Sequence, residues 1–431
     1  MEDKLPEVTI TKLVEGGQGL GELPGGKKVF VWNALPGEVL GVRIIKQKHS
    51  YAEAIAEKII KPSPERVEPA RSYFVSTSPW QMMTFAAENQ YKEQLVRDIF
   101  AQAKVPLPPF QLTTTSVNPS AANPEEQPGL YHYRNKMEYS FWGDDDGIHL
   151  AIHIRGTHGK QIITESALGM KRIDAAANSL CSQLTALHLR GSDLKTVILR
   201  ASEDGTTTAS LFVKREPFPE IELPKELQGL RVYFSNPKSP ASVRTKLLQE
   251  SGEVLLSDSI LGQRFTYDTD SFFQVNVPMY ERALQSIKNH SSERILVDMY
   301  AGVGSIGLSV ATKAVELIEL DPATAKMAAV NAAASKLDAQ VIETSAEKAL
   351  DYITADKPVI FDPPRAGLHQ KVAARVLEVL PPKITYLSCN PTTHARDLAL
   401  LQDKYIITYF EAFNFFPRTP HIETLAILQR R

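Results

Sequence analysis

The feature that most constrains the fold is an apolar segment that runs straight into a glycine-rich turn. Residues 294–298 read Arg-Ile-Leu-Val-Asp, residues 299–305 read Met-Tyr-Ala-Gly-Val-Gly-Ser, and apolar positions then recur at helical spacing. Gly302 and Gly304 let the backbone come close to a ligand, because a side chain there would occupy the space that the ligand needs. The segment therefore predicts a strand, a turn and a helix with a nucleoside-cofactor site at the turn.

Two cofactors compete for such a turn. Gly302, Gly304 and Gly307 satisfy the G-x-G-x-x-G spacing of dinucleotide-binding proteins. Asp298, just before the turn, would repel a pyrophosphate but suits the ammonium group of a methionine moiety. Glu319, in the next apolar segment, can accept both hydroxyls of a ribose. Together the two carboxylates favour S-adenosylmethionine (SAM). An NAD-dependent dehydrogenase and a strand-turn-helix without a ligand are the alternatives.

The C-terminal third alternates predicted strands and helices in the doubly wound manner. We expect helices at 322–336, 346–353, 369–380 and 392–401, and strands at 340–343, 358–361, 384–387, 406–410 and 425–429. The carboxyl ends of the strands should carry the chemistry of such a domain. The pattern predicts an α/β catalytic domain, to which we assign residues 266–431.

The motif Asp362-Pro363-Pro364-Arg365 follows one of these strands. Two prolines after a carboxylate prevent the normal start of a helix, so the backbone stays extended beyond the sheet edge, with unpaired carbonyls that can hydrogen-bond a planar base. Amino methyltransferases typically have an aromatic residue in the fourth position, where this chain has Arg365. The motif therefore argues against methylation of an exocyclic amine.

Two further reactive side chains stand beside predicted strands. Cys389 lies between a strand and a helix whose N-terminal amides lower the pKa of a thiol, so it is a candidate nucleophile. Glu423 precedes an apolar strand, where desolvation should raise the pKa of its carboxyl and suit it to act as a general base. A small buried residue and a surface glutamate are the respective alternatives.

Residues 1–62 predict a small β-barrel. Short apolar segments at 8–14, 28–32, 39–47 and 51–60 are separated by glycine and proline turns. A run of this length can close a barrel of about five strands, the OB-like size used for nucleic acid, and its lysines give it a basic bias. The whole chain is nearly neutral, with 48 Lys and Arg against 50 Asp and Glu, so a nucleic-acid surface must be a local patch.

Residues 63–265 predict a mostly β central domain that recognises RNA, with a helix at 173–189. A helix near 86–103 is expected to pack on the catalytic domain, and a loop rich in proline, serine and threonine should follow at 105–129. Aromatic and cationic residues alternate from 131 to 136, which suits stacking on bases and pairing with phosphates. The candidate RNA-binding residues are Tyr133, Arg134, Asn135 and Lys136. A strand edge with charges that reach solvent is the alternative.

The number of cysteines and the length of the apolar runs indicate the cellular compartment of the protein. Cys181 and Cys389 are the two cysteines, which excludes a disulfide scaffold and fits a reducing cytosol. The N-terminus has no apolar signal core, and no apolar run approaches the length of a membrane span. No acid or cysteine cluster completes a metal site around His149 and His153. We expect a cytoplasmic monomer without a metal.

Taken in order, these motifs resemble the RNA uridine-C5 methyltransferase family. The resemblance rests on Gln274 within 271–276, the turn at Gly302 and Gly304, and the segments 362–365, 388–391 and 421–423. The N-terminal segments 17–21 and 35–38 resemble the TRAM domain found in many members. The resemblance covers nearly the whole chain. It implies a class I SAM-dependent methyltransferase (Rossmann-like) domain after an OB-like TRAM barrel and a mostly β central domain.

The resemblance also implies roles for individual residues. Cys389 would be the nucleophile, Glu423 the base, and Arg365 a contact to RNA. The SAM pocket would be lined by Gln274, Tyr300, Ser305, Glu319, Ser345 and Asp362. Uracil C5 is too poor a nucleophile to take a methyl group directly, so a thiolate that adds to C6 makes C5 enolate-like. The base must leave its stack to meet both side chains.

The chain departs from the family pattern in two places. Many TRAM-bearing members hold an iron-sulfur cluster with four cysteines, but residues 71–81 and the stretch near Ser166 contain none, so no cluster is expected. Asn414 stands where relatives usually carry Asp.

The TRAM module favours 23S ribosomal RNA as the substrate, and the T-loop of transfer RNA is the alternative. From a different class, a non-catalytic RNA-binding protein with a methyltransferase fold is the other possibility.

Overall fold

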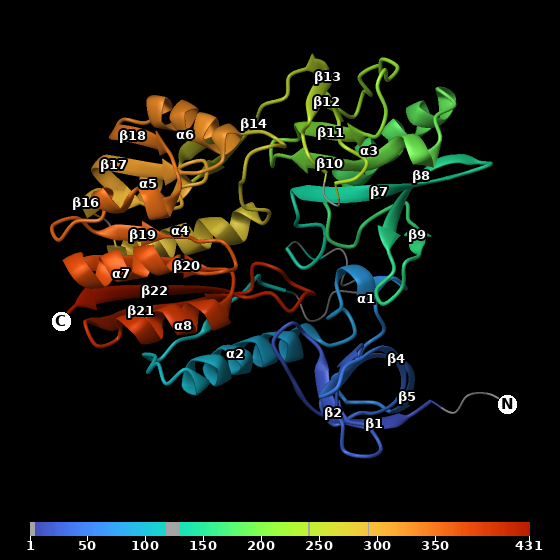
Figure 1. The fold of residues 1–431 in the computed structure, drawn as a ribbon, viewed down its shortest axis with the longest axis horizontal. Coiled ribbons are helices and arrows are strands. Elements are labelled where there is room, and N and C mark those ends of the chain that lie inside the picture. Colours follow the sequence, from blue (N-terminus) through green and yellow to red (C-terminus); the bar gives the residue numbers. More distant parts are fainter. Residues whose placement is uncertain (1–4, 118–126, 128, 240–241, 292) are drawn as a thin grey trace.

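The computed structural model describes residues 5–117, 127, 129–239, 242–291 and 293–431. Figure 1 shows a barrel (blue), a central sheet with one long helix (green) and a C-terminal sheet flanked by helices (orange and red). The predicted α/β catalytic fold, the OB-like barrel and the mostly β central part are confirmed. Within the described ranges, no helix is both long enough and apolar enough to span a membrane.

Five strands form the closed N-terminal barrel in the order β1-β2-β3-β5-β4. They are β1 (Glu7–Leu13), β2 (Gly19–Glu22), β3 (Lys28–Trp32), β4 (Val39–Gln47) and β5 (Tyr51–Lys61). Val8 and Ile10 of β1 point into the barrel and alternate with exposed polar residues, as a strand with one buried face requires. Lys28 of β3 pairs with Tyr51 of β5 in a parallel arrangement.

A long helix connects the barrel to the C-terminal sheet. After the short helix α1 (Phe74–Thr77) comes α2 (Phe85–Gln102), whose N-cap Thr84 accepts a hydrogen bond from the N–H of Ala87. Leu95, Val96 and Phe100 of α2 pack in the same hydrophobic cluster as residues of the C-terminal sheet. Beyond α2, the two-residue strand β6 (Leu112–Thr113) pairs with the sheet edge inside the predicted loop, which is too short a strand for periodicity to reveal.

The central part is a seven-stranded sheet in the order β13-β12-β11-β10-β7-β8-β9. Its elements are β7 (Lys136–Asp144), β8 (Gly147–His153), β9 (Lys160–Ile162), α3 (Lys171–Ala186), β10 (Leu194–Ala201), β11 (Thr207–Val213), β12 (Gly229–Phe234) and β13 (Lys246–Gly252). Helix α3 buries its apolar side, including Leu180 and Leu184, against this sheet. The hairpin β14 (Leu256–Ile260) and β15 (Gln263–Tyr267) then packs in the core of the C-terminal domain.

The C-terminal sheet has the order β18-β17-β16-β19-β20-β22-β21-β6. Its elements are α4 (Val277–Ser291), β16 (Glu293–Asp298), α5 (Ser305–Val310), β17 (Ala311–Glu319), α6 (Pro322–Ala334), β18 (Asp338–Glu343), β19 (Val359–Phe361), α7 (Gln370–Val379), β20 (Lys383–Ser388), α8 (Pro391–Leu401), β21 (Tyr405–Phe413) and β22 (Glu423–Arg430). One hydrophobic cluster joins the sheet to α4, α5 and α6, and another joins it to α2, α7 and α8, so helices cover both faces. The strand order reverses between β16 and β19, where ligands of such sheets bind.

Two helical features differ from the sequence expectation. The predicted helix at 346–353 is instead two 3₁₀ turns, Ala346–Lys348 and Leu350–Tyr352. Eight residues without a continuous apolar face do not sustain an α-helix. Helix α4 lies outside the predicted elements, although Tyr280, Leu284 and Ile287 form a buried stripe at helical spacing.

Candidate active site

Two carboxylates fix the backbone of the glycine turn between β16 and α5. Gly302 and Gly304 have φ angles of 57° and 87°, a region that favours glycine. Oε2 of Glu319 accepts a hydrogen bond from the N–H of Gly302 (2.9 Å), and Oδ2 of Asp298 accepts one from the N–H of Gly307 (2.9 Å). The side chains of Glu319 and Asp298 therefore fix the turn at both of its ends through backbone hydrogen bonds.

Asp298 does not line the cavity above this turn. Its side chain is fully buried, and burial raises the pKa of its carboxyl to about 7. The prediction that Asp298 meets the ammonium group of a methionine moiety is therefore wrong for this structure. The sequence places the carboxylate next to the glycines, but the direction in which it points depends on how the turn closes over it.

A cavity of about 1070 Å³ lies along the carboxyl edge of the sheet. Its wall contains the predicted residues Gln274, Tyr300, Gly302, Ser305, Glu319, Ser345, Asp362, Arg365, Cys389 and Glu423, together with Arg134. Gly304 belongs to the turn but not to the wall. The volume is of the order that cofactor sites typically have.

The wall near Glu319 fits the nucleoside part of SAM. Besides the N–H of Gly302, Glu319 accepts a hydrogen bond from the N–H of Asp321 (2.7 Å to Oε1). Each carboxylate oxygen keeps a second lone-pair site for a ribose hydroxyl. A Cβ at Gly302 would meet no atom nearer than Cδ1 of Phe272 at 3.8 Å, so the glycine leaves this part of the cavity open. Phe272 is 59% exposed and offers an apolar ring at the same wall.

Strand pairing brings the thiol and a carboxyl group to the same end of the sheet. β22 runs antiparallel to β20, with Ser388 opposite Thr424. Cys389 therefore follows β20 at the place where Glu423 begins β22, and both side chains line the cavity. Each motif is visible in the sequence, but only the antiparallel pairing of the last strand puts the two groups side by side.

Glu423 is a desolvated carboxyl, as its place before an apolar strand predicts. It is 2% exposed, and its Oε2 has no hydrogen-bond partner among the described residues. Burial, together with repulsion from the carboxyl of Asp362, raises the pKa of Glu423 well above its ordinary value. Burial also raises the pKa of Asp362 to about 8. A carboxylate with so high a proton affinity is suited to take a proton from a carbon atom.

The thiol of Cys389 has a raised pKa, of about 12. Partial burial is the main cause, and the carboxyls of Glu423 and Asp362 add to it, while the guanidinium of Arg365 opposes it. The prediction of a lowered thiol pKa is therefore wrong for this structure. The amides at the start of α8 are engaged elsewhere, because Oδ1 of Asn390 accepts a hydrogen bond from the N–H of Thr392 (3.1 Å).

Alkylation with iodoacetamide measures this pKa. Only the thiolate reacts, so the rate at Cys389 is expected to rise about tenfold per pH unit from pH 7 to pH 10, whereas an ordinary thiol levels off near pH 9. Glu423→Gln removes a negative charge and should raise the rate at pH 10. Peptide mapping separates Cys389 from the buried Cys181. A plateau near pH 9, or an equal rate in the variant, would contradict this account.

Two of the five predicted RNA-binding residues are structural. Tyr133 is 5% exposed and Asn135 is 0% exposed. The hydroxyl of Tyr133 donates to the carbonyl of Pro417 (3.1 Å), and Nδ2 of Asn135 donates to the carbonyl of Gln274 (3.0 Å). The prediction that these two side chains contact RNA is wrong for this structure, because they are used to join the central domain to the cavity wall.

Of the three remaining predicted cations, Arg134 and Arg365 line the cavity and Lys136 does not. Arg134 lines the cavity, with its guanidinium 5.9 Å from the centre of the Phe416 ring. Nη2 of the exposed Arg365 lies 3.2 Å from Nδ1 of His421. Lys136 is partly exposed, its Nζ donates to a backbone carbonyl (3.2 Å), and burial lowers its pKa to about 7. Arg134 and Arg365 are thus the two predicted RNA contacts at the cavity itself.

A buried network fixes residues 414–422 between β21 and β22, which we call the carboxylate loop. Oδ1 of Asn414 accepts a hydrogen bond from Nζ of Lys92 (2.6 Å), and Nδ2 of Asn414 donates to Oε1 of Glu88 (3.0 Å). All three side chains are 0% exposed. Asn414 therefore donates and accepts at once, which an ionised Asp at this position could not do.

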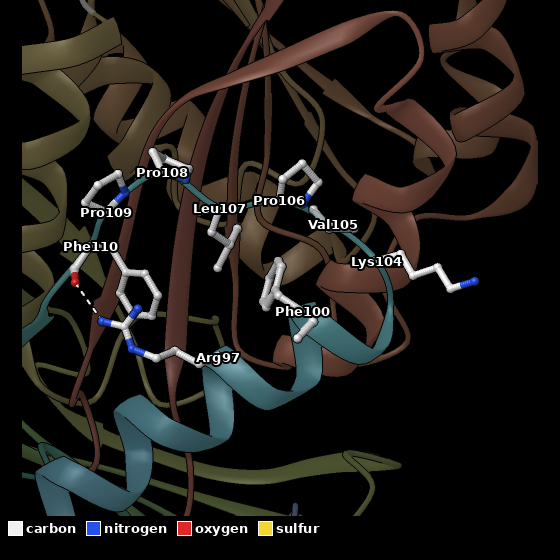
Figure 2. Close-up of a pocket in the computed structure, with 10 residues that line it drawn as sticks. Arg97, Phe100, Lys104, Val105, Pro106, Leu107, Pro108, Pro109 and Phe110 are labelled. Carbon is white, nitrogen blue, oxygen red and sulfur yellow. Dashed lines mark hydrogen bonds between the residues drawn. The ribbon is translucent and has the colours of Figure 1, made fainter.

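A second hollow, of about 880 Å³, lies at the C-terminal end of α2 (Figure 2). Nη2 of Arg97 donates to the carbonyl of Phe110 (3.3 Å), and its guanidinium lies 4.4 Å from the centre of the Phe110 ring. None of the described residues that line this hollow carries a carboxylate, a thiol or an imidazole, so we assign no chemistry to it. In the part of the chain that the structure describes, no group of three or more His, Cys, Asp or Glu residues could hold a metal ion.

Comparison with known proteins gives matches over nearly the whole chain. A sequence model of the tRNA (uracil-5-)-methyltransferase family matches residues 121–431, and a TRAM domain model matches residues 4–56. An uncharacterized RNA methyltransferase of Caldanaerobacter subterraneus is 29% identical over 461 residues, which covers 98% of this chain and 99% of that protein. Another, of Lactobacillus johnsonii, is 28% identical over 460 residues and covers 100% of this chain and 99% of its own.

One solved structure shares the fold along its full length. The Pyrococcus abyssi tRNA (uracil-54, C5)-methyltransferase, in complex with S-adenosyl-L-homocysteine, matches with a TM-score of 0.78 and 22% sequence identity. The match covers 98% of this chain and 100% of that chain. The similarity extends from the barrel to the last strand of the C-terminal sheet.

Proposed function

The chain belongs to the tRNA (uracil-5-)-methyltransferase family and carries a TRAM domain, and from this premise we propose that Cys389 and Glu423 carry out the reaction on one flipped uridine. The enzyme is a SAM-dependent RNA (uracil-5)-methyltransferase. The observation that carries the proposal is the shared position of two groups at adjacent ends of β20 and β22 in one cavity. One is a thiol, and the other is a carboxyl oxygen that has no hydrogen-bond partner among the described residues.

In the proposed reaction the two side chains act in turn on the pyrimidine ring. The thiol of Cys389 gives its proton to solvent, the thiolate bonds to C6, and the electrons of the C5–C6 double bond move toward O4. SAM, when bound, supplies the methyl group that C5 receives. Glu423 then takes the C5 proton, the double bond forms again, and the bond between sulfur and C6 breaks. Partial burial keeps water from the ring during these steps.

Further residues are proposed to hold the two substrates. Glu319 would accept the ribose hydroxyls of SAM, while Arg134 and Arg365 would pair with phosphates beside the flipped nucleotide. The other wall residues proposed for SAM are Gln274, Tyr300, Gly302, Ser305, Ser345 and Asp362. Gly304 does not contact SAM in this proposal, but its positive φ angle allows the backbone to form the turn next to the cavity wall. We further propose that the enzyme works as a monomer in the cytoplasm.

The proposed substrate is a uridine of 23S ribosomal RNA, with a T-loop uridine of transfer RNA as the second candidate. The TRAM barrel favours the ribosomal target. The transfer-RNA target is favoured by the Pyrococcus abyssi structure, which is that of an enzyme named for uracil 54 of transfer RNA.

Mapping of 5-methyluridine tests the function and separates the two targets. Ribosomal and transfer RNA from cells that lack the gene would be incubated with purified protein and SAM and analysed by mass spectrometry. We expect one new 5-methyluridine in 23S ribosomal RNA. A new 5-methyluridine in transfer RNA alone would assign the second candidate. Methylation of another atom, or SAM-independent binding without methylation, would contradict the proposed function.

A further inference from the structure

The N-terminal barrel shares its packing with the catalytic core. Leu13, at the end of β1, and Leu35 are buried in the hydrophobic cluster that contains Val297 of β16 and Phe361 of β19. The barrel interior, with Val8 and its neighbours, forms a separate cluster. A module tethered by a flexible linker would not contribute core residues to its neighbour. The barrel is therefore placed to act on the geometry of the active site.

The turn between β1 and β2 packs closely against the carboxylate loop. Gly17 is buried, and a Cβ at this position would lie 2.7 Å from Cβ and Cγ of Pro420 and 3.0 Å from Nε1 of Trp80. Pro420 stands three residues before Glu423. The indole N–H of the fully buried Trp80 donates to the carbonyl of Gly17 (3.0 Å). Only glycine allows this approach without displacement of the loop.

Trp80 also holds the most constrained residue of the carboxylate loop. Its backbone N–H donates to the carbonyl of Arg418 (3.1 Å), and the φ angle of Arg418 is 65°, a region that residues other than glycine rarely adopt. The backbone N–H of Arg418 donates to Oε2 of Glu88 (3.0 Å), and its Nη1 donates to the carbonyl of Met83 (2.9 Å). Contacts from the N-terminal part of the chain thus keep this loop in an otherwise unfavourable conformation.

We propose that Gly17 and Trp80 are positioning residues for the catalytic carboxyl of Glu423, so that the barrel helps to set the turnover rate in addition to any affinity for RNA. The inference rests on the proposed function and adds to it a role for the barrel. Gly17 packs against Pro420, and Trp80 donates a backbone hydrogen bond to Arg418. Pro420 and Arg418 both belong to the carboxylate loop, which leads into β22. Displacement of this loop should therefore affect proton removal from C5 more than bond formation by Cys389.

Gly17→Ala and Gly16→Ala form a matched pair for the test. Gly17 and Gly16 have φ angles of 94° and 87°, but a Cβ at Gly16 would meet no atom of the described residues within 4 Å. Both variants carry the same kind of backbone strain, and only Gly17→Ala pushes on Pro420. We expect kcat at saturating RNA and SAM to fall about 10- to 100-fold in Gly17→Ala and by less than about twofold in Gly16→Ala, with little change in the KM for RNA.

Trp80→Phe is a second variant that tests the same role of the barrel contact. Trp80→Phe keeps an aromatic ring, adds no atoms and removes the N–H that reaches Gly17, so it gives the same comparison should Gly17→Ala fail to fold. We expect it to lower kcat at least about threefold with the KM for RNA unchanged. An equal kcat in Trp80→Phe and the unsubstituted protein would overturn the role of Trp80.

RNA that contains 5-fluorouridine identifies the affected step, because its C5 has no proton to lose. Covalent adduct formation in Gly17→Ala should stay within about threefold of the unsubstituted protein, although its kcat on uridine RNA falls further. Equal kcat in the two glycine variants, a rise in KM alone, or an equal loss of adduct formation would overturn the inference. Absence of methylation by the unsubstituted protein would instead overturn the proposed function, and this inference with it.

Discussion

Replacement of Cys389 by alanine is expected to lower the rate of uridine methylation by at least about 10⁴-fold. Without the thiolate no bond forms at C6, and C5 remains too weak a nucleophile to accept a methyl group. Cys389 lies at the cavity wall, at the end of β20 and opposite the start of β22. The measurement is the transfer of labelled methyl groups from SAM to the RNA substrate under single-turnover conditions.

Cys181→Ala is the matched control for this substitution. Cys181 is the only other cysteine of the chain, and it lies buried in α3 of the central domain. Its loss should leave the methylation rate within about twofold of that of the unsubstituted protein, provided that the variant stays folded. SAM affinity should be similar in both variants. A Cys389→Ala protein that keeps a tenth of the normal rate would remove the thiol from the mechanism.

Replacement of Glu423 by glutamine is expected to trap the reaction after the thiol has bonded to the ring. Glutamine has nearly the same shape but cannot take the C5 proton, so turnover should fall about 10²- to 10⁴-fold. Since Cys389 is intact, a covalent complex with ordinary uridine RNA should accumulate in the presence of SAM. The unpartnered Oε2 of Glu423 means that the substitution breaks no hydrogen bond at that atom within the described residues.

Denaturing gel electrophoresis with labelled RNA detects the trapped complex. We expect a slowly migrating band with Glu423→Gln and no such band with the double variant that also carries Cys389→Ala. Normal turnover by Glu423→Gln would assign proton removal to another group. Asp362, whose pKa is also raised, would then be the next carboxyl to test.

Much of the C-terminal fold is predictable because its strands are continuous apolar runs. The strands β19 and β20 and the second half of β16 are almost wholly buried and have helices on both faces of their sheet, so their sequences show little polar alternation. Strand β6 is not predictable, since two residues show no periodicity and its pairing partner, β21, lies about three hundred positions away in the sequence. Helix α4 did carry a signal, the stripe of Tyr280, Leu284 and Ile287.

The candidate site is predictable only to the level of motifs. Cys389 is predictable as a reactive residue directly after an apolar strand and Glu423 as one directly before an apolar strand, and the resemblance supplies most of the other wall residues. The direction of a side chain depends on packing that motifs do not record. For that reason the motifs assign Asp298, Tyr133 and Asn135 to ligands, whereas in the structure all three are buried and none lines the cavity.

The raised pKa of the Cys389 thiol could not be predicted from the sequence either. A helix start after Cys389 predicts a lowered pKa, but the opposing carboxyls come from β19 and β22, which only the folded sheet brings near. The carboxylate loop gives a similar case. His421 lies within the motif at 421–423, yet its position at the cavity wall, beside Phe416, becomes clear only once the loop is folded.

The bond between the enzyme and its substrate tests the central claim most directly. Unsubstituted protein would be incubated with SAM and RNA that contains 5-fluorouridine, the complex digested with protease and nuclease, and the linked peptide sequenced by mass spectrometry. We predict a single cross-link from the sulfur of Cys389 to C6 of a ring that already carries the methyl group at C5. A cross-link at any other residue, or a complex that forms equally well with Cys389→Ala, would contradict the account.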